Sequence, residues 1–210
     1  MSVILFDKEY DNVFFTSDEH YGSERAIKFS RRLPFIHDGI FDTELMDKTL
    51  VENFNSVVHE NDVTFHLGDF GNIDMVKNLN GDHILILGNY ERDDLAVHIY
   101  EGDSIAQYLQ HLREKGFIIV RTFNFHLPNP IFNDDTLKKI SLNLCHEPSR
   151  CITDVGNMYN LFGHIHEKRK ITKYGLNVGV DGNFFFPYSL DDVGFYINAI
   201  INYYDDEVYL

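Results

Sequence analysis

The chain of 210 residues has no tryptophan, only two cysteines and only five prolines. Cys145 and Cys151 lie six positions apart, which is neither a zinc-knuckle spacing nor a disulfide framework, so they favour a reducing compartment. No charge-poor stretch of 18 apolar residues occurs, and residues 1–11 lack the basic region and small-residue cleavage site of a signal peptide. These absences predict a cytoplasmic protein without a membrane span.

Basic residues are scarce as well. Lys and Arg number 18 and Asp and Glu 33, which gives a net charge of −15 with neutral histidines. A protein that binds a nucleic-acid backbone needs a positive face, so this balance disfavours a polymeric nucleic acid as partner. The length and the 44% hydrophobic content suit a globular domain that folds without disulfide or metal. We therefore predict one domain over residues 1–210, in which a metal would serve chemistry.

Apolar runs that end in polar residues recur along the chain and predict strands. Five such strands are expected to end at residues 17–20, 68–69, 88–89, 146 and 163–166. Helical spacing of apolar residues predicts a helix over residues 41–58 with Asp42 as its cap, and shorter helices over residues 74–80 and 104–116, the last ended by Gly116. Alternating strands and helices predict an α/β sheet with right-handed crossovers. Residues 21–40, 92–104 and 121–136 are expected to be loops that set specificity.

Ligands of such sheets bind beyond the carboxyl ends of the strands, so the five polar clusters are expected to meet at one site. The candidate metal ligands there are Asp18, His20, Asp69, Asn89, His146, His164 and His166. This mixture of carboxylate, amide and imidazole suits manganese, iron or zinc, whereas a calcium site would be nearly all oxygen. A glycine precedes three of these ligands, at positions 68, 88 and 163, which predicts tight turns or close backbone approach.

The order of these residues resembles the calcineurin-like metallophosphoesterases, whose pattern is D-x-H, G-D, G-N-H-D/E, a lone H and G-H-x-H. The corresponding segments are residues 18–20, 68–69, 88–91, 146 and 163–166, and the tail at 177–181, 187 and 190–191 is similar to small bacterial and phage members. The resemblance implies a four-layer α/β/β/α sandwich of two mixed sheets flanked by helices. It also implies a cytoplasmic location, in a bacterium or in the host of a phage.

A two-metal centre follows from the same resemblance. One divalent ion is expected on Asp18, His20, Asp69 and His166, and a second on Asp69, Asn89, His146 and His164, with Asp69 bridging. Manganese is the expected metal, and iron, zinc, nickel or cobalt are alternatives. Two such ions activate a hydroxide and hold the oxygens of an in-line displacement at phosphorus. The implied function is hydrolysis of a small, nucleotide-like phosphomonoester or phosphodiester, with Asp69, Asn89, Tyr90 and His146 as catalytic residues.

Tyr90 departs from the family pattern, because it stands where the family has a histidine that assists the leaving group. A phenol, with a pKa near 10, is a poorer proton donor than an imidazole with a pKa near 6.5, but it can hydrogen-bond a phosphate oxygen. Arg92 is a candidate for supplying positive charge instead. Two alternatives stay open: a catalytically weakened scaffold that binds metal and a phosphorylated ligand, and a nuclease of the same superfamily.

The remaining notable residues receive structural interpretations. His66 lies inside an apolar strand and is interpreted as a core residue, and Cys145 as a small core residue at a strand end. His126 is interpreted as capping a strand. Arg31 and Arg32 either bind a substrate phosphate or belong to a solvated loop. Five histidines in polar surroundings are expected at the surface: His37, His59, His83, His98 and His111.

Overall fold

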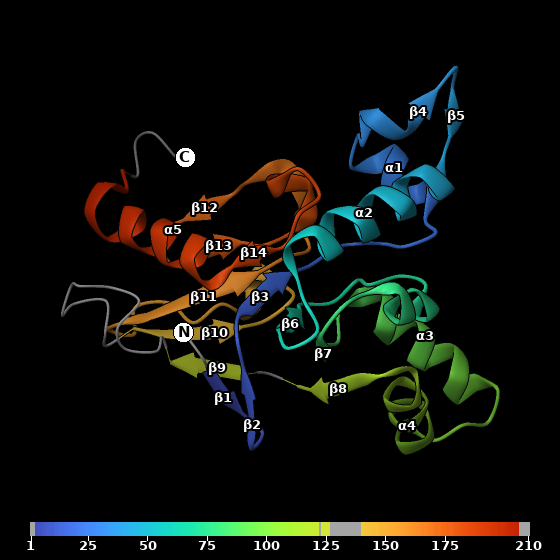
Figure 1. The fold of residues 1–210 in the computed structure, drawn as a ribbon, viewed down its shortest axis with the longest axis horizontal. Helices are drawn as coiled ribbons and strands as arrows, with labels where there is room; N and C mark the ends of the chain where they lie inside the picture. Colours follow the sequence, from blue (N-terminus) through green and yellow to red (C-terminus); the bar gives the residue numbers. More distant parts are fainter. Residues whose placement is uncertain (1–2, 122, 127–139, 206–210) are drawn as a thin grey trace.

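The computed structural model describes residues 3–121, 123–126 and 140–205, and two five-stranded sheets form its framework (Figure 1). The first sheet has the order β14 (Tyr188–Ser189), β3 (Val13–Thr16), β6 (Val63–His66), β7 (Asp82–Ile86) and β8 (Phe117–Val120). The second has the order β12 (Ile171–Thr172), β13 (Gly175–Asn177), β11 (Met158–Phe162), β10 (Ser141–Leu144) and β9 (Phe123–His126).

Both sheets are mixed, and their central strands are parallel. In the first sheet β3, β6, β7 and β8 are parallel, and β14 is antiparallel to β3. In the second sheet β13, β11 and β10 are parallel, and the outer strands β12 and β9 are antiparallel to their neighbours. Two short pairs lie apart, β1 (Val3–Leu5) with β2 (Lys8–Tyr10) and β4 (Ile36–His37) with β5 (Ile40–Phe41). The expected mixed α/β fold is confirmed.

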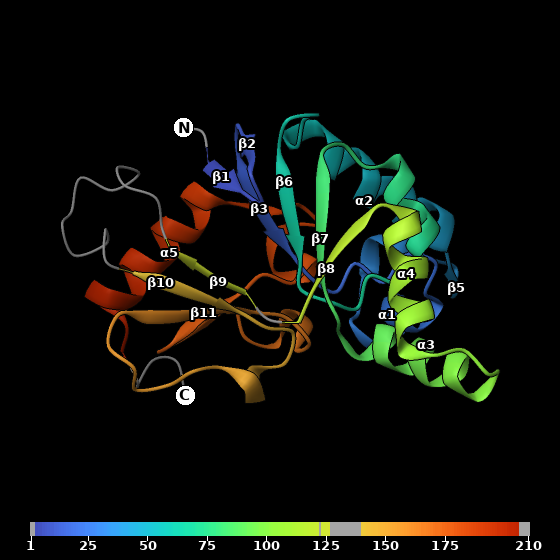
Figure 2. The ribbon, with the colours of Figure 1, turned by 90° about the horizontal axis from the view of Figure 1, so that it is seen from below.

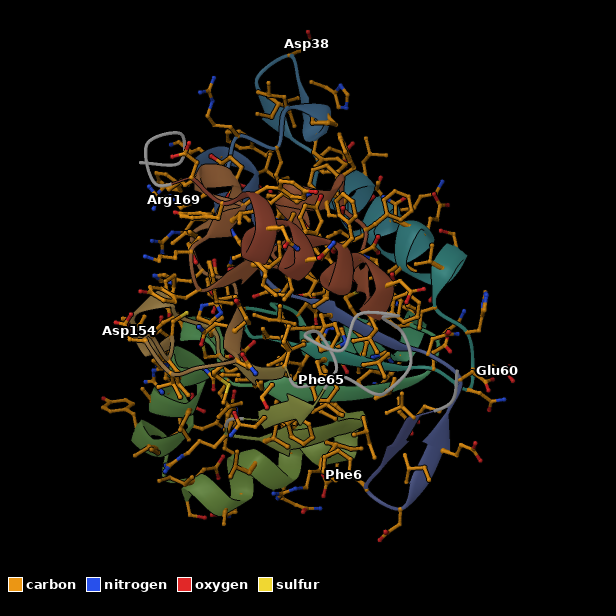
Figure 3. The ribbon with its side chains drawn as sticks, turned by 90° about the vertical axis from the view of Figure 1, so that its left-hand side faces the viewer. Phe6, Asp38, Glu60, Phe65, Asp154 and Arg169 are labelled. Atoms are coloured by element: carbon orange, nitrogen blue, oxygen red, sulfur yellow. The ribbon has the colours of Figure 1, made fainter. Side chains whose placement is uncertain are left out.

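Alternate residues of the first sheet supply two separate cores. Phe15 and Phe65 pack with Leu142 and Leu161 of the second sheet, with their two phenyl rings stacked at 5.5 Å between centroids. Phe14, the neighbour of Phe15, joins the other core, because successive side chains of a strand point to opposite faces. Figure 3 shows Phe65 in the interior, whereas Asp38 and Glu60 lie at the periphery. One apolar core therefore lies between the two sheets, and the second lies between the first sheet and the helices that cover it.

The described residues also form five α-helices: α1 (Glu24–Phe29), α2 (Thr43–Val57), α3 (Asn89–Tyr100), α4 (Ile105–Lys115) and α5 (Leu190–Tyr203). Helices α2 and α4 lie on the side of the first sheet that faces away from the second (Figure 2). The predicted helices over 41–58 and 104–116 are confirmed, with Asp42 accepting from the Leu45 N–H at 2.8 Å and Gly116 ending α4 at a φ of +119°. None of the helices in the described residues has the length and apolar character to cross a bilayer.

Four expectations about local structure differ from the structure. Residues 92–104, expected as a loop, mostly belong to α3, which the apolar pattern misses because this helix is largely exposed and among its residues only Glu91 is buried. The predicted helix over 74–80 is a 3-10 helix, Ile73–Asn78. Residues 21–40 hold α1 and β4. The last expected loop contains β9, whose final residue is His126, and residues 127–136 lie outside the described residues.

The two cysteines are free thiols, and Cys145 is buried just after β10, as expected. Folding brings the two Sγ atoms to 4.0 Å despite the six-residue spacing.

Candidate metal centre

The carboxyl ends of five strands, three from the first sheet and two from the second, meet at one site. β3, β6 and β7 arrive from the first sheet, and β10 and β11 from the second. The Asp18 N–H donates to the Gly68 carbonyl at 3.0 Å, and the Gly163 N–H donates to the His146 carbonyl at 2.9 Å. His146 Nδ1 joins the two sheets by its bond to the Leu67 carbonyl at 2.8 Å. The candidate ligands of distant chain segments thereby become neighbours.

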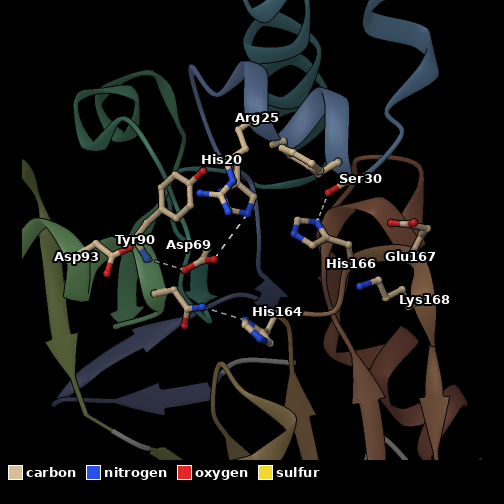
Figure 4. Close-up of a pocket in the computed structure, with 13 residues that line it drawn as sticks. His20, Arg25, Ser30, Asp69, Tyr90, Asp93, His164, His166, Glu167 and Lys168 are labelled. Atoms are coloured by element: carbon tan, nitrogen blue, oxygen red, sulfur yellow. Dashed lines mark hydrogen bonds and ion pairs between the residues drawn. The ribbon is translucent and has the colours of Figure 1, made fainter.

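Six of the seven candidate ligands form two triads that can each hold a metal ion, with ligand atoms within 4.8 Å of one another: Asp18, His20 and His166 in one, and Asp69, His146 and His164 in the other. Asp69 belongs to the second triad and also lies beside the first. Its Oδ2 is 3.7 Å from His20 Nε2 in the first triad, and its Oδ1 is 3.4 Å from His146 Nε2 in the second. One carboxylate therefore faces both triads, and Figure 4 draws its contact with His20 as a dashed line.

The backbone at this site is strained in a way the sequence does not reveal. Asp18, His20, Asp69, His164 and His166 have φ values of +59°, +54°, +57°, +72° and +52°, in the left-handed region. Such a conformation costs a non-glycine residue about 1–3 kcal/mol and concentrates at functional sites. The surrounding bonds maintain it: the His20 N–H donates to the Asp69 carbonyl at 3.0 Å, and the His164 N–H donates to Asp18 Oδ2 at 2.8 Å.

The expected close approach at the glycines is present. Gly68 has a φ of +96°, and a Cβ there would lie 2.5 Å from Gly88 Cα. A Cβ on Gly88 would lie 2.5 Å from the Asp69 N atom. The segments that carry Asp69 and Asn89 can therefore pack together only because these two positions have no side chain.

The protonation chemistry of the triads suits a cation. His146 Nδ1 is held by the Leu67 carbonyl, and its buried Nε2 points at Asp69 Oδ1, 3.4 Å away. Burial lowers the pKa of His146, but the hydrogen bond and charge of Asp69 outweigh it and raise the pKa to about 9. Burial lowers the pKa of His20 to about 3, so this imidazole is neutral. Divalent transition metals bind carboxylates and neutral imidazole nitrogens, so a metal ion at this site would take the place of the proton that Asp69 favours on His146.

The segment that begins α3 adds Asn89 and Tyr90 to the site. Asn89 Nδ2 lies 3.3 Å from His164 Nδ1, so this residue adjoins the second triad. The Tyr90 N–H donates to Asp69 Oδ1 at 2.9 Å, its ring centroid lies 4.5 Å from that of His20, and its hydroxyl is 3.2 Å from Ser23 Oγ. Arg92 donates to Asn89 Oδ1 and to Glu147 Oε1, both at 2.5 Å. Its guanidinium is thus paired within the protein.

Buried acidic residues that the sequence analysis left without a role organise the site. Glu91 accepts hydrogen bonds from the N–H groups of Gly88, Asp69 and Phe70 at 2.7, 3.0 and 2.8 Å, so it fixes the turns that carry two ligands. Burial raises the pKa of this carboxyl. Its place in the G-N-x-E segment was the signal that could have found it.

Glu19 connects the site to a buried histidine pair. Its Oε1 lies 2.6 Å from His66 Nδ1, and His66 Nε2 lies 3.0 Å from His83 Nδ1. The expectation that His66 is a core residue is confirmed, since it is fully buried. His83, expected at the surface, is buried with 5% of its area exposed, because it packs against His66 and Phe54.

Arg31 and Arg32 differ completely in environment. Arg31 is exposed, whereas Arg32 is buried and donates to both oxygens of Asp181, at 2.8 and 3.0 Å, and to the carbonyls of Asp18 and Glu19. Asp181 in turn lies 2.7 Å from His166 Nδ1. Arg32 therefore neither belongs to a solvated loop nor contacts a substrate, but holds the residues that orient a candidate ligand.

The two triads open into a cavity of about 360 Å³, drawn in Figure 4. His20, Asp69, Asn89, His164 and His166 line its floor on the metal side. Tyr90 and α1 line its walls, with Lys168 and Glu167 opposite. A cavity of this size lies near the lower end of the range for small-molecule sites.

Comparison with known proteins supports the fold and names no activity. No family model matches this chain. The chain is 27% identical over 121 residues to the uncharacterized protein MJ1445 of Methanocaldococcus jannaschii, a match that covers 54% of this chain and 63% of that protein, less than two thirds of its length. The crystal structure of a protein of unknown function, AQ665 from Aquifex aeolicus, has a TM-score of 0.54 and 21% identity, covering 85% of this chain and 95% of that one.

Proposed function

We propose that this chain is a two-metal phosphoesterase of the calcineurin-like metallophosphoesterase type, which hydrolyses a small, nucleotide-like phosphomonoester or phosphodiester. The observation that carries the proposal is the position of Asp69, whose two carboxylate oxygens face two separate His/Asp triads. A single structural metal would need one closed set of ligands. Two adjoining sets that share a carboxylate and open into a cavity favour catalysis at a pair of metals.

The arrangement of sheets and helices supports the same assignment. We infer that the two mixed sheets, with α2 and α4 on one outer side and α5 beside the second sheet, correspond to the four-layer α/β/β/α sandwich of that family. The order of the five polar segments along the chain is the other support.

The chain's own residues would divide the work. Two divalent ions, manganese foremost, would supply Lewis-acid stabilisation and an activated water when bound. Asp18, His20 and His166 would hold one, Asn89, His146 and His164 the other, and Asp69 both. Tyr90 lines the cavity, and its hydroxyl, 3.2 Å from Ser23 Oγ, would donate a hydrogen bond to a phosphoryl oxygen. The net charge of −15 disfavours a polymeric substrate.

The test is a screen of the manganese-supplemented protein against phosphomonoesters, phosphodiesters and cyclic nucleotides, together with the variant Asp69→Asn. This substitution keeps the shape and removes the charge shared by both triads. We expect it to lower activity more than 100-fold, because even outer residues of a metal site typically contribute about 10- to 100-fold. The matched control is Asp74→Asn, an exposed carboxylate that pairs with Lys77 and Lys115. Binding of one ion or none, or full activity of Asp69→Asn, would refute the two-metal assignment.

A further inference from the structure

The mouth of the metal cavity carries an exposed aromatic ring. Phe29, the last residue of α1, lines the cavity and has 70% of its area exposed. Arg25, one turn earlier on the same helix face, holds its guanidinium carbon 5.7 Å from the centre of this ring, and Lys28 Nζ lies 5.6 Å from it. A single exposed phenylalanine is ordinary on a protein surface. Phe29, however, lies at the mouth of a polar cavity beside two cations, and this combination is suited to binding a ligand.

Two cations line this mouth, and among the described residues no carboxylate pairs with either of them. Arg25 and Lys168 both line the cavity, from α1 and from the opposite wall (Figure 4). Within the described residues neither forms a hydrogen bond or an ion pair with a carboxylate, although the chain has 33 Asp and Glu. Two further carboxylates, Asp93 and Glu167, line the same cavity and interrupt the positive charge. The mouth is therefore suited to one compact anion, and not to a long phosphate backbone.

We propose that Phe29, Arg25 and Lys168 form a subsite for the part of the substrate beyond the scissile phosphate, and that this part is a nucleoside whose sugar carries a second phosphate. This inference rests on the proposed function, and it narrows the substrate class to nucleotides with two phosphate groups. The exposed ring of Phe29 would stack on the base, since every base has a π-face. Arg25 and Lys168 would bind the second phosphate by charge-assisted hydrogen bonds.

The test measures equilibrium binding by calorimetry to the manganese-loaded protein. The probes are phosphonate analogues of ribose 5-phosphate, AMP and adenosine 3′,5′-bisphosphate, in which a methylene group replaces each ester oxygen so that they bind without being hydrolysed. The three probes differ in the ring and in the second phosphorus group, and release of phosphate is measured separately on the natural phosphates. We expect each addition to tighten binding. Phe29→Ala should remove the advantage of AMP over ribose 5-phosphate, a loss of roughly 5- to 100-fold, while Phe29→Trp keeps it. Arg25→Gln and Lys168→Gln should each reduce the advantage of the bisphosphate over AMP by roughly 10-fold. Lys48→Gln, an exposed lysine on α2, is the control.

The outcomes separate this inference from the function on which it rests. Equal binding of the three probes, or ratios that Phe29→Ala and Arg25→Gln leave unchanged, would overturn the subsite, even if the protein hydrolyses the natural phosphates. If the ratios change as expected but no phosphate is released in manganese, the subsite is supported and the phosphoesterase assignment falls.

Discussion

The buried guanidinium of Arg32 gives the sharpest test of how this site is held together. We consider Arg32→Met, which replaces the side chain by an apolar one of similar length. The Arg32 side chain is fully buried, and that of its partner Asp181 is 3% exposed. The substitution removes two bonds to Asp181 and the bonds to the carbonyls of Asp18 and Glu19.

The expected cost follows from the charge that remains. Asp181 would stay buried with His166 Nδ1 as its remaining hydrogen-bond partner, and removal of one member of a buried ion pair typically costs about 3–5 kcal/mol. For a chain of this length 1 kcal/mol corresponds to about 2–4 °C in Tm, so Tm should fall by roughly 6–20 °C. Arg32→Lys keeps the positive charge but loses the paired hydrogen bonds to Asp181, so its Tm should lie between those of the wild type and Arg32→Met.

Chemical denaturation of the metal-free protein measures this cost. Arg31→Met is the matched control, since its exposed side chain predicts a change within about 0.5 kcal/mol. The double variant Arg32→Met/Asp181→Asn should be less destabilised than the sum of the single variants, because it leaves no buried charge unpaired. A loss below 1 kcal/mol in Arg32→Met, or strict additivity in the double variant, would refute this account of the pair.

Three further predictions follow from the same site. A chelator should abolish activity but leave a cooperative unfolding transition, because the apolar cores contain no candidate metal ligand. The unfolding temperature should fall only by the equivalent of the lost binding free energy, and unfolding of the protein on chelation would show that the metals are structural. Tyr90→His should raise kcat/KM for esters with poor leaving groups more than for esters with good ones, by up to ~10²–10⁴-fold, because an imidazole is the better proton donor. If kcat/KM depends on the leaving-group pKa with the same slope in both proteins, position 90 takes no part in proton transfer. Burial lowers the pKa of His66 and His83 to about 3, so the unfolded chain takes up protons below pH 6.5 that the native protein does not. Unfolding free energy should therefore decrease as pH falls from 6.5 toward 3, by up to about 1.4 kcal/mol per pH unit for each histidine. In His66→Gln the unfolding free energy should depend less steeply on pH between 6.5 and 4 than in the wild type. An unchanged dependence would contradict the prediction that His66 is neutral in the native protein.

Local periodicity determined much of the fold. The strands at Val13–Thr16, Val63–His66 and Asp82–Ile86 follow from short apolar runs, because central parallel strands are buried on both faces. Helix α2 follows from its 3.6-residue apolar spacing and from Asp42 at its start. Helix α3 could not be predicted in this way, because its stability does not depend on one buried apolar face.

The sequence also determined which residue types collect at the strand ends, since a strand's carboxyl end is a local property. The family resemblance already implied that these residues divide between two ions with Asp69 shared, and the tertiary structure brings six of them together as two triads with Asp69 beside both. Only the tertiary structure decided that five of these residues have left-handed backbone. It also decided that Arg32 is buried against Asp181, 149 positions away, while Arg31 is exposed. The physical reason is that burial, pairing and strain are set by contacts between distant segments, and neighbouring residues of identical type meet different partners when the chain closes on itself.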